Sequence, residues 1–226
     1  MRQLQGETAQ LAITGLLHRG NELTATLMVN NIAGHKFPTG IPARRTWIHF
    51  SVVDADGQMV FDSGKPLTDG RIEGNDADVD VKNYEPHYDV LSHPDQVQIY
   101  EGVMLDTDNE ITYTLLRAAS FAKDNRLLPN GFDKSSASPE IAVYGRAASD
   151  ENFIGGSDQV TYKVDTTGHR GPYTVSARLL FTAVAYPFVK DMEKDWDLPE
   201  VNRFMYLYRS ADKQPQEIKA VRTTVL

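Results

Sequence analysis

The chain has 226 residues, 41% of them hydrophobic, which is long enough to bury the core of one large domain. No apolar run approaches the ~18 residues of a membrane-spanning helix. The absence of cysteine excludes disulfides, thiolate metal sites and haem attachment through Cys-x-x-Cys-His within this chain. The N-terminal residues also lack the apolar segment of a secretory signal peptide.

The formal net charge of -8 is unevenly distributed along the chain. Residues 54–110 contain fifteen acidic and three basic side chains, and the remainder is net positive. Nucleic acid is therefore not an expected partner, because phosphate is repelled by an acidic surface. A cation or a basic protein surface suits this charge better.

Alternation of apolar and polar residues with period two dominates the sequence and is typical of half-buried strands. It predicts strands over 11–17, 23–29, 46–53, 58–64, 96–104, 111–117, 140–145, 159–164, 172–186 and 218–225. The segment 121–134 is predicted to be a connection that tucks Leu127 and Leu128 against the core.

One helix is predicted, over 199–211, and it begins at Pro199. An apolar stripe along it consists of Val201, Phe204, Met205 and Tyr208. Many short strands, turns rich in Gly and Pro, and one late helix predict an all-β fold. We expect a single β-sandwich domain over 1–226, immunoglobulin-like or jelly-roll-like, with long loops and a C-terminal helix.

The segment 31–47 is predicted to be a stiff loop between two strands. Pro38 and Pro42 fix their own backbone angles, and Gly34 and Gly40 permit angles closed to other residues. Such a loop can hold His35 at a fixed angle, and histidine in that setting can bind a metal or shuttle protons. Alternatively, the loop is a structural corner in which His35 bonds its own backbone.

Residues 65–95 form an acidic stretch without clear periodicity, and we expect an irregular insertion there. Several carboxylates on irregular backbone are what calcium requires. The candidate metal ligands of this stretch are Asp76, Asp78, Asp80, Glu85, His87 and Asp89. The alternative is a solvated acidic loop that holds no ion.

Several blocks resemble a region of multihaem c-type cytochromes. The first is Gly-His-Lys-Phe-Pro-Thr-Gly at 34–40, followed by Arg-Arg-Thr-Trp-Ile-His at 44–49. Later blocks lie at 85–88, 94–101, 115–117, 123–134 and 155–162, so that the resemblance covers about 20–186. In those proteins a β-rich, haem-free domain sits beside the haem-bearing part. This chain departs from the family in having no Cys-x-x-Cys-His motif, so it resembles only that accessory domain.

The resemblance implies a periplasmic or extracellular location, because c-type haem is attached there. It also implies a non-catalytic domain or subunit that docks on a multihaem cytochrome and supports it in electron transfer. His35 is the candidate axial ligand to a haem of that partner. Lys36, Arg44 and Arg45 are candidates to contact the haem propionates, because basic side chains pair with carboxylates.

Two other functions stay open at this stage. The first is an extracytoplasmic module that binds carbohydrate or another ligand through exposed aromatic rings. The second is a metal-dependent hydrolase that uses His35, His49, His87 or His93 with Glu85 or Asp89. No His-Glu-x-x-His or Gly-x-Ser-x-Gly pattern is present, so the sequence favours a protein that is not an enzyme.

Overall fold

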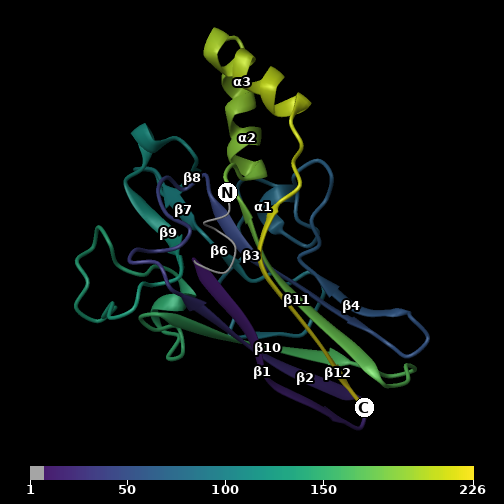
Figure 1. Cartoon of the computed structure of the whole chain (residues 1–226). Helices are drawn as coiled ribbons and strands as arrows, with labels where there is room; N and C mark the ends of the chain where they lie inside the picture. Colours follow the sequence, from purple (N-terminus) through teal and green to yellow (C-terminus); the bar gives the residue numbers. More distant parts are fainter. Residues whose placement is uncertain (1–7) are drawn as a thin grey trace.

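A computed structural model describes residues 8–226 and contains two facing β-sheets, a smaller third sheet and helices near the C-terminus (Figure 1). The first sheet has four strands in the order β1 (Ala9–Arg19), β2 (Glu22–Asn31), β10 (Ser157–Asp165) and β5 (Val90–Leu91). Its pairings are antiparallel, except that β5 lies parallel to β10. The strands predicted over 11–17 and 23–29 are thus confirmed, and they pair as neighbours with β2 inside the sheet.

The second sheet contains the longest predicted strand. Its order is β12 (Gln216–Val225), β11 (Tyr173–Thr182), β3 (Arg45–Val53) and β4 (Met59–Ser63), and β6 (Ile99–Tyr100) also pairs with β3. The third sheet has the order β8 (Ile111–Thr112), β7 (Gly102–Leu105) and β9 (Ser120–Asp124).

The core lies between the two large sheets, as the alternation predicts. Leu23, Ala25, Leu27 and Val29 of β2 are fully buried, while the residues between them are only half-buried. Phe50 of β3 stacks on Tyr162 of β10 with ring centroids 3.9 Å apart, which joins the two sheets directly. This packing confirms the prediction of an all-β sandwich.

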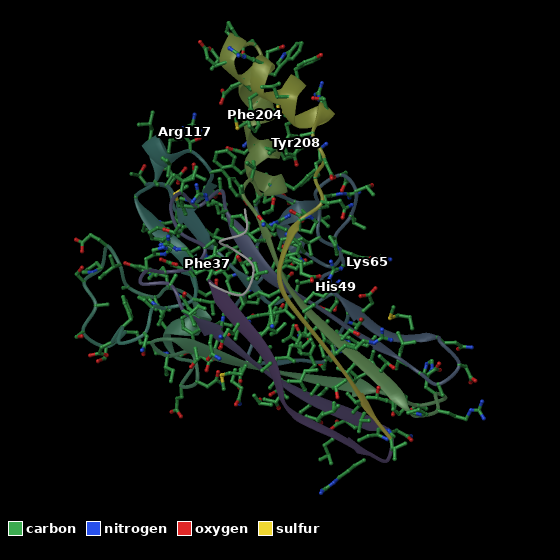
Figure 2. The ribbon with its side chains drawn as sticks, viewed as in Figure 1. Phe37, His49, Lys65, Arg117, Phe204 and Tyr208 are labelled. Atoms are coloured by element: carbon green, nitrogen blue, oxygen red, sulfur yellow. The ribbon has the colours of Figure 1, made fainter. Side chains whose placement is uncertain are left out.

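Helices occur at one end of the sandwich. They are α1 (Asp76–Val79), α2 (Tyr186–Met192) and α3 (Pro199–Ser210), with short 3₁₀ turns η1 (Leu115–Arg117), η2 (Arg146–Ala148) and η3 (Glu193–Asp195). Figure 2 shows Phe204 and Tyr208 on the helical arm and Arg117 on η1 at the same end. The predicted C-terminal helix is α3, whereas α2 was not predicted.

Five predicted elements differ from the structure. The strand over 96–104 is divided between β6 and β7, which belong to different sheets. The segment 140–145 is not a strand, because only Tyr144 pairs there, with Asp124. The connection 121–134 includes most of strand β9, and the strand over 111–117 ends at Thr112. The strand over 172–186 ends at Thr182. The insertion at 65–95 contains α1 and β5, although most of it is irregular, as predicted.

No helix among residues 8–226 is both long enough and apolar enough to cross a membrane.

Candidate functional site

The loop that carries His35 is anchored by the buried amide of Asn31 at the end of β2. Its Nδ2 donates to the carbonyl oxygens of His35, at 2.8 Å, and Leu127, at 2.9 Å. Phe37 and Leu127 exchange two backbone hydrogen bonds of 2.9 and 2.8 Å. Loop 32–44 is therefore tied to a second, distant segment of the chain and does not rest on its own turns alone.

His35 itself is exposed, and its Nδ1 lies 3.0 Å from the carbonyl oxygen of Lys36. A carbonyl oxygen only accepts, so Nδ1 carries the proton of the neutral imidazole. Nε2 then has the free electron pair. A backbone carbonyl that fixes the tautomer in this way is the usual outer partner of a metal-ligating histidine.

The other three candidate cofactor-binding residues are held within the domain. Lys36 Nζ donates to Asp124 at 2.8 Å and to the carbonyl oxygen of Ala142 at 3.0 Å. Arg44 Nη1 donates to the carbonyl oxygen of Thr39 at 2.9 Å. Arg45 is fully buried and forms a two-pronged ion pair with Asp78, with distances of 2.8 and 2.9 Å. Arg44 is thus the basic candidate that is half-buried without a carboxylate partner.

The six candidate metal ligands are distributed over different environments. Asp76 and Asp80 are exposed, whereas Asp78 is buried against Arg45. Glu85 is buried and accepts from the Tyr88 hydroxyl at 2.8 Å. Burial raises the pKa of Glu85, although the Tyr88 hydroxyl opposes this rise. The calcium site expected from these residues stays a prediction.

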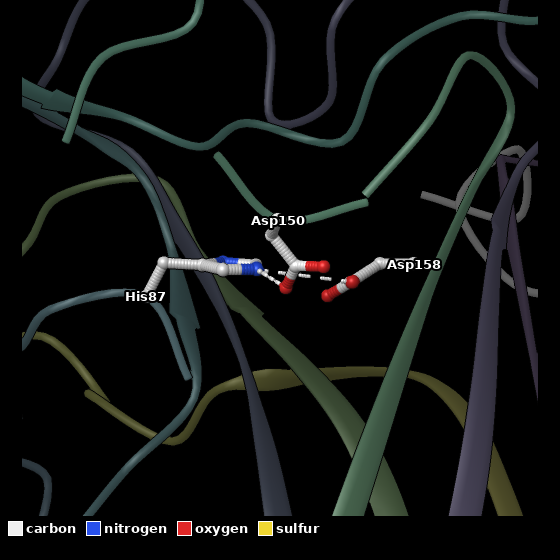
Figure 3. Close-up of side chains that lie close together, drawn as sticks. All are labelled: His87, Asp150 and Asp158. Carbon is white, nitrogen blue, oxygen red and sulfur yellow. Dashed lines mark hydrogen bonds and ion pairs between the residues drawn. The ribbon is translucent and has the colours of Figure 1, made fainter. Parts of the chain in front are cut away.

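Asp89 is exposed and accepts from the side-chain amide of Asn152 at 2.8 Å. His87, the sixth candidate, lies in a different cluster, which sequence reasoning missed. Within residues 8–226, one group of three metal-ligating side chains converges: His87, Asp150 and Asp158 (Figure 3). Its ligand atoms lie within 4.8 Å of one another. The sequence carries one signal for this cluster. Alternation with period two places Asp158 on the same face of β10 as the apolar Val160.

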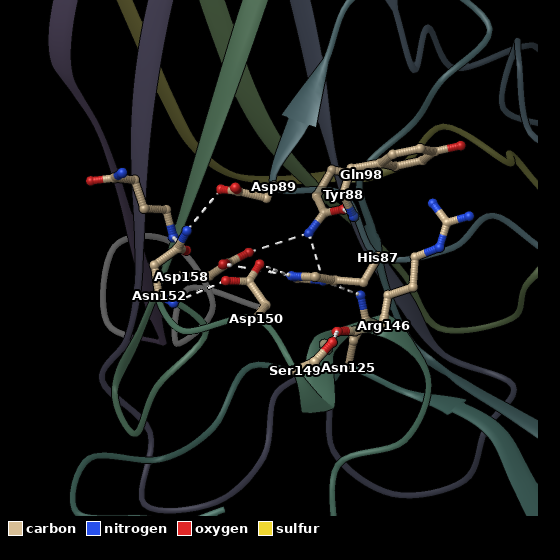
Figure 4. A network of polar contacts seen from close by, with 12 residues as sticks. His87, Tyr88, Asp89, Gln98, Asn125, Arg146, Ser149, Asp150, Asn152 and Asp158 are labelled. Carbon is tan, nitrogen blue, oxygen red and sulfur yellow. Dashed lines mark hydrogen bonds and ion pairs between the residues drawn. The ribbon is translucent and has the colours of Figure 1, made fainter.

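The hydrogen bonds around His87 fix its tautomer (Figure 4). Gln98 Nε2 and Asn125 Nδ2 lie 2.9 and 3.0 Å from His87 Nδ1. Their amide oxygens accept from the backbone N–H groups of Tyr88 and Glu101, so neither amide is free to flip. Both amides therefore donate to Nδ1.

It follows that His87 is neutral, with its proton on Nε2. Nε2 donates to Asp150 at 3.1 Å and lies 3.8 Å from Asp158. Neither ring nitrogen offers an electron pair to a metal in this arrangement. The spacing of the cluster resembles a metal site, but its hydrogen bonds describe a histidine that acts as a donor.

The two carboxyl groups of the cluster are shifted in opposite directions. Burial raises the pKa of Asp158, which has no exposed surface. Burial would also raise the pKa of Asp150, but hydrogen bonds from His87 and from the backbone N–H of Asn152 hold it below its usual range. An open pocket adjoins the cluster, and its lining includes His87 and Asp150 together with Asp89, Arg146, Ser149 and Glu151.

Comparison with known proteins yields one result. No protein-family model matches the chain, and no curated protein matches it. Among solved structures, the chain is similar to a penta-haem cytochrome c552 from Thermochromatium tepidum, with a TM-score of 0.56 and 14% sequence identity. The similarity covers 99% of this chain but 41% of the cytochrome chain. At this identity the similarity shows a shared fold.

Proposed function

We propose that this chain is a haem-free β domain that docks on a multihaem c-type cytochrome and supports it in electron transfer. The observation that carries the proposal is the fold likeness to a penta-haem cytochrome along 99% of the chain. That cytochrome is more than twice as long as the region it shares with this chain, which leaves room for a separate haem-bearing part. Because c-type haem is attached outside the cytoplasm, the proposed partnership implies a location in the periplasm or beyond it.

The absence of cysteine limits how the domain can take part in electron transfer. It cannot hold a haem covalently, so any haem that it contacts belongs to a partner domain or subunit. The exposed His35 supplies the required chemistry, because its Nδ1 is bonded to Lys36 and its Nε2 is free to bind iron. A second histidine on a haem iron closes the sixth coordination position and favours electron transfer over ligand binding.

Arg44 is the basic residue best placed to contact a haem propionate beside His35. Its side chain is half-buried and makes one hydrogen bond, to Thr39, whereas Lys36 and Arg45 are occupied by buried carboxylates. Lys36 and Arg45 then serve the domain itself, by fixing the loop on which His35 stands.

The test uses the complex isolated from the native source with either His35→Ala or His93→Ala. His93 is also exposed and serves as the matched control. We expect His35→Ala to convert one haem from a six-coordinate, low-spin spectrum to a high-spin spectrum that responds to carbon monoxide. His93→Ala should leave the spectrum unchanged. An unchanged spectrum in His35→Ala would exclude axial ligation, and loss of the haem protein from wild-type preparations would exclude docking.

A further inference from the structure

The buried carboxyl group of Asp158 has one oxygen without a partner. Oδ2 accepts from the Tyr100 hydroxyl at 2.7 Å and from Gln98 Nε2 at 3.2 Å. Oδ1 has no hydrogen-bond partner among the residues that the structure describes. Asp158 has 0% exposed surface, so bulk water does not solvate this oxygen. A buried acceptor left unpaired is costly, and the cost is greater for a charged group.

The groups around Asp158 do not balance a negative charge. His87, 3.8 Å from Oδ1, is neutral because its Nδ1 accepts from two fixed amides. The second carboxyl group of the cluster, Asp150, lies beside Asp158, since the ligand atoms of the cluster are all within 4.8 Å of one another. Tyr100 and Tyr162, the remaining titratable neighbours, are neutral phenols whose pKa is raised mainly by burial. An ionised Asp158 would therefore be a buried anion beside another anion.

We propose that Asp158 holds a proton on Oδ1 and forms an acid–carboxylate pair with Asp150, and that this pair fastens the loop 145–156 to the sandwich until rising pH removes the proton. Two carboxyl groups that share a site cannot both ionise without strong repulsion. In the protonated state, one negative charge remains, on Asp150, and it is stabilised by the N–H of His87. In the deprotonated state, the repulsion acts on the loop that carries Asp150.

The cluster joins four stretches of the chain that are distant in sequence. His87 and Gln98 come from the segment before β6, Asn125 follows β9, Asp150 follows η2, and Asp158 belongs to β10. Two residues before Asp158, the carbonyl oxygen of Gly156 accepts from the backbone N–H of Asn31 at 2.9 Å. Loosening of loop 145–156 would thus affect Asn31, the residue that anchors loop 32–44.

The sign of the pH effect follows from the direction of the shift. A group whose pKa is raised on folding contributes stability below its unfolded pKa, and this stability is lost as the pH rises through the folded pKa. Asp158→Asn is the matched variant, because an amide Nδ2 at the position of Oδ1 mimics the protonated acid while the amide oxygen accepts from Tyr100. Glu151→Gln, which removes an exposed carboxylate of the same pocket, is the control.

Thermal unfolding is measured from pH 5 to pH 8.5. We expect the Tm of Asp158→Asn to exceed that of the wild type by about 2–4 °C or more at pH 8. The difference should shrink toward pH 5, and Glu151→Gln should follow the wild type throughout. A lower Tm of Asp158→Asn at every pH would overturn the proposal. So would a rise in wild-type Tm on addition of zinc chloride that Asp158→Asn lacks, because Oδ1 would then be a metal ligand.

A second measurement needs no variant. Infrared spectra of wild-type protein containing isotope-labelled aspartate report the carbonyl stretch of protonated carboxyl groups. Among the described aspartates, Asp158 is the one whose pKa is raised. A labelled protonated-carboxyl band that persists at pH 7 supports the proposal. Its absence at pH 7 overturns the proposal, whatever the stability of the variants.

Discussion

Arg45 and Asp78 form the most deeply buried ion pair that the structure describes. Arg45 has 0% exposed surface, and its guanidinium also donates to the carbonyl oxygen of Gly70 at 3.1 Å. Burial would lower the pKa of Arg45, but Asp78 outweighs burial and raises it. The pair therefore stays charged, and it joins the first residue of β3 to the acidic insertion at α1.

Removing one partner should cost much more than removing both. We expect Arg45→Met to lower the free energy of unfolding by about 3–5 kcal/mol, because it leaves a buried, unpaired carboxylate. Asp78→Asn in the same chain should recover part of the loss, since an amide oxygen still accepts from the backbone N–H of Ile72. Urea unfolding of the single and double variants measures this. An equal loss of unfolding free energy in Arg45→Met and in the double variant would contradict this expectation.

Asp124 provides a pH-dependent contribution at the base of the His35 loop. Burial would raise the pKa of Asp124, but the Arg126 guanidinium and the Lys36 ammonium outweigh burial and hold it below the usual 3.8. A lowered pKa contributes stability above the unfolded pKa, and that stability is lost as the pH falls through the folded pKa. Acid should therefore loosen this contact.

Asp124→Asn tests this contribution. The variant should be less stable than the wild type at pH 7, because Lys36 and Arg126 lose their carboxylate, and its stability should fall less between pH 5 and pH 3. Denaturant unfolding at these pH values gives both quantities. Asp108→Asn is the control, because that side chain is exposed and lies outside the contact of Lys36, Asp124 and Arg126. Identical acid dependence in wild type and Asp124→Asn would refute the assignment.

At the level of elements, loop 32–44 depends on Asn31. Its amide makes three hydrogen bonds, to the carbonyl oxygens of His35 and Leu127 and from the backbone N–H of Ala33, and the residue is 2% exposed. Asn31→Ala should lower the free energy of unfolding by about 1–3 kcal/mol, because buried backbone groups lose their partner.

Hydrogen exchange locates the effect of this change. Amides in 32–44 should exchange faster in Asn31→Ala, while those of β11 should not. Asn30→Ala, at the neighbouring half-buried position of the same strand, should leave both regions unchanged. Faster exchange over the whole molecule would mean that Asn31 supports the fold in general and not this loop.

Elements with strict alternation could be predicted from sequence, and those determined by distant partners could not. β2 alternates along its whole length and β11 alternates from Tyr173 to Leu179, so their inward faces were evident. Helix α2 follows an apolar run that reads as a continuing strand, but Pro187 lacks a ladder donor and suits a first helical turn. β9 exists because β7 pairs with it, which local sequence does not reveal.

The candidate sites show the same division. The loop of His35 carries its own signals in Gly and Pro, so its position between two strands could be predicted. The environment of His87 could not, because Asp150 and Asp158 follow it by 63 and 71 positions and only the fold brings them together. Similarly, local sequence does not reveal that Arg45, a candidate haem contact, and Asp78, a candidate calcium ligand, form an ion pair with each other.

At the scale of the whole molecule, the sandwich holds an exposed histidine on an anchored loop and contains no cysteine of its own. Its fold is shared with a region of a penta-haem cytochrome. A domain of this kind has a role in electron transfer only if a haem protein accompanies it. The proposed function therefore requires association with a haem protein, whatever the outcome for any single side chain.

The most direct test is an absorption spectrum of the protein isolated from its native source under mild conditions. The account predicts a Soret band with sharp α and β bands on reduction, in constant proportion to this chain through successive purification steps. A spectrum that contains only the absorption of tyrosine and tryptophan would contradict a stable association with a multihaem cytochrome.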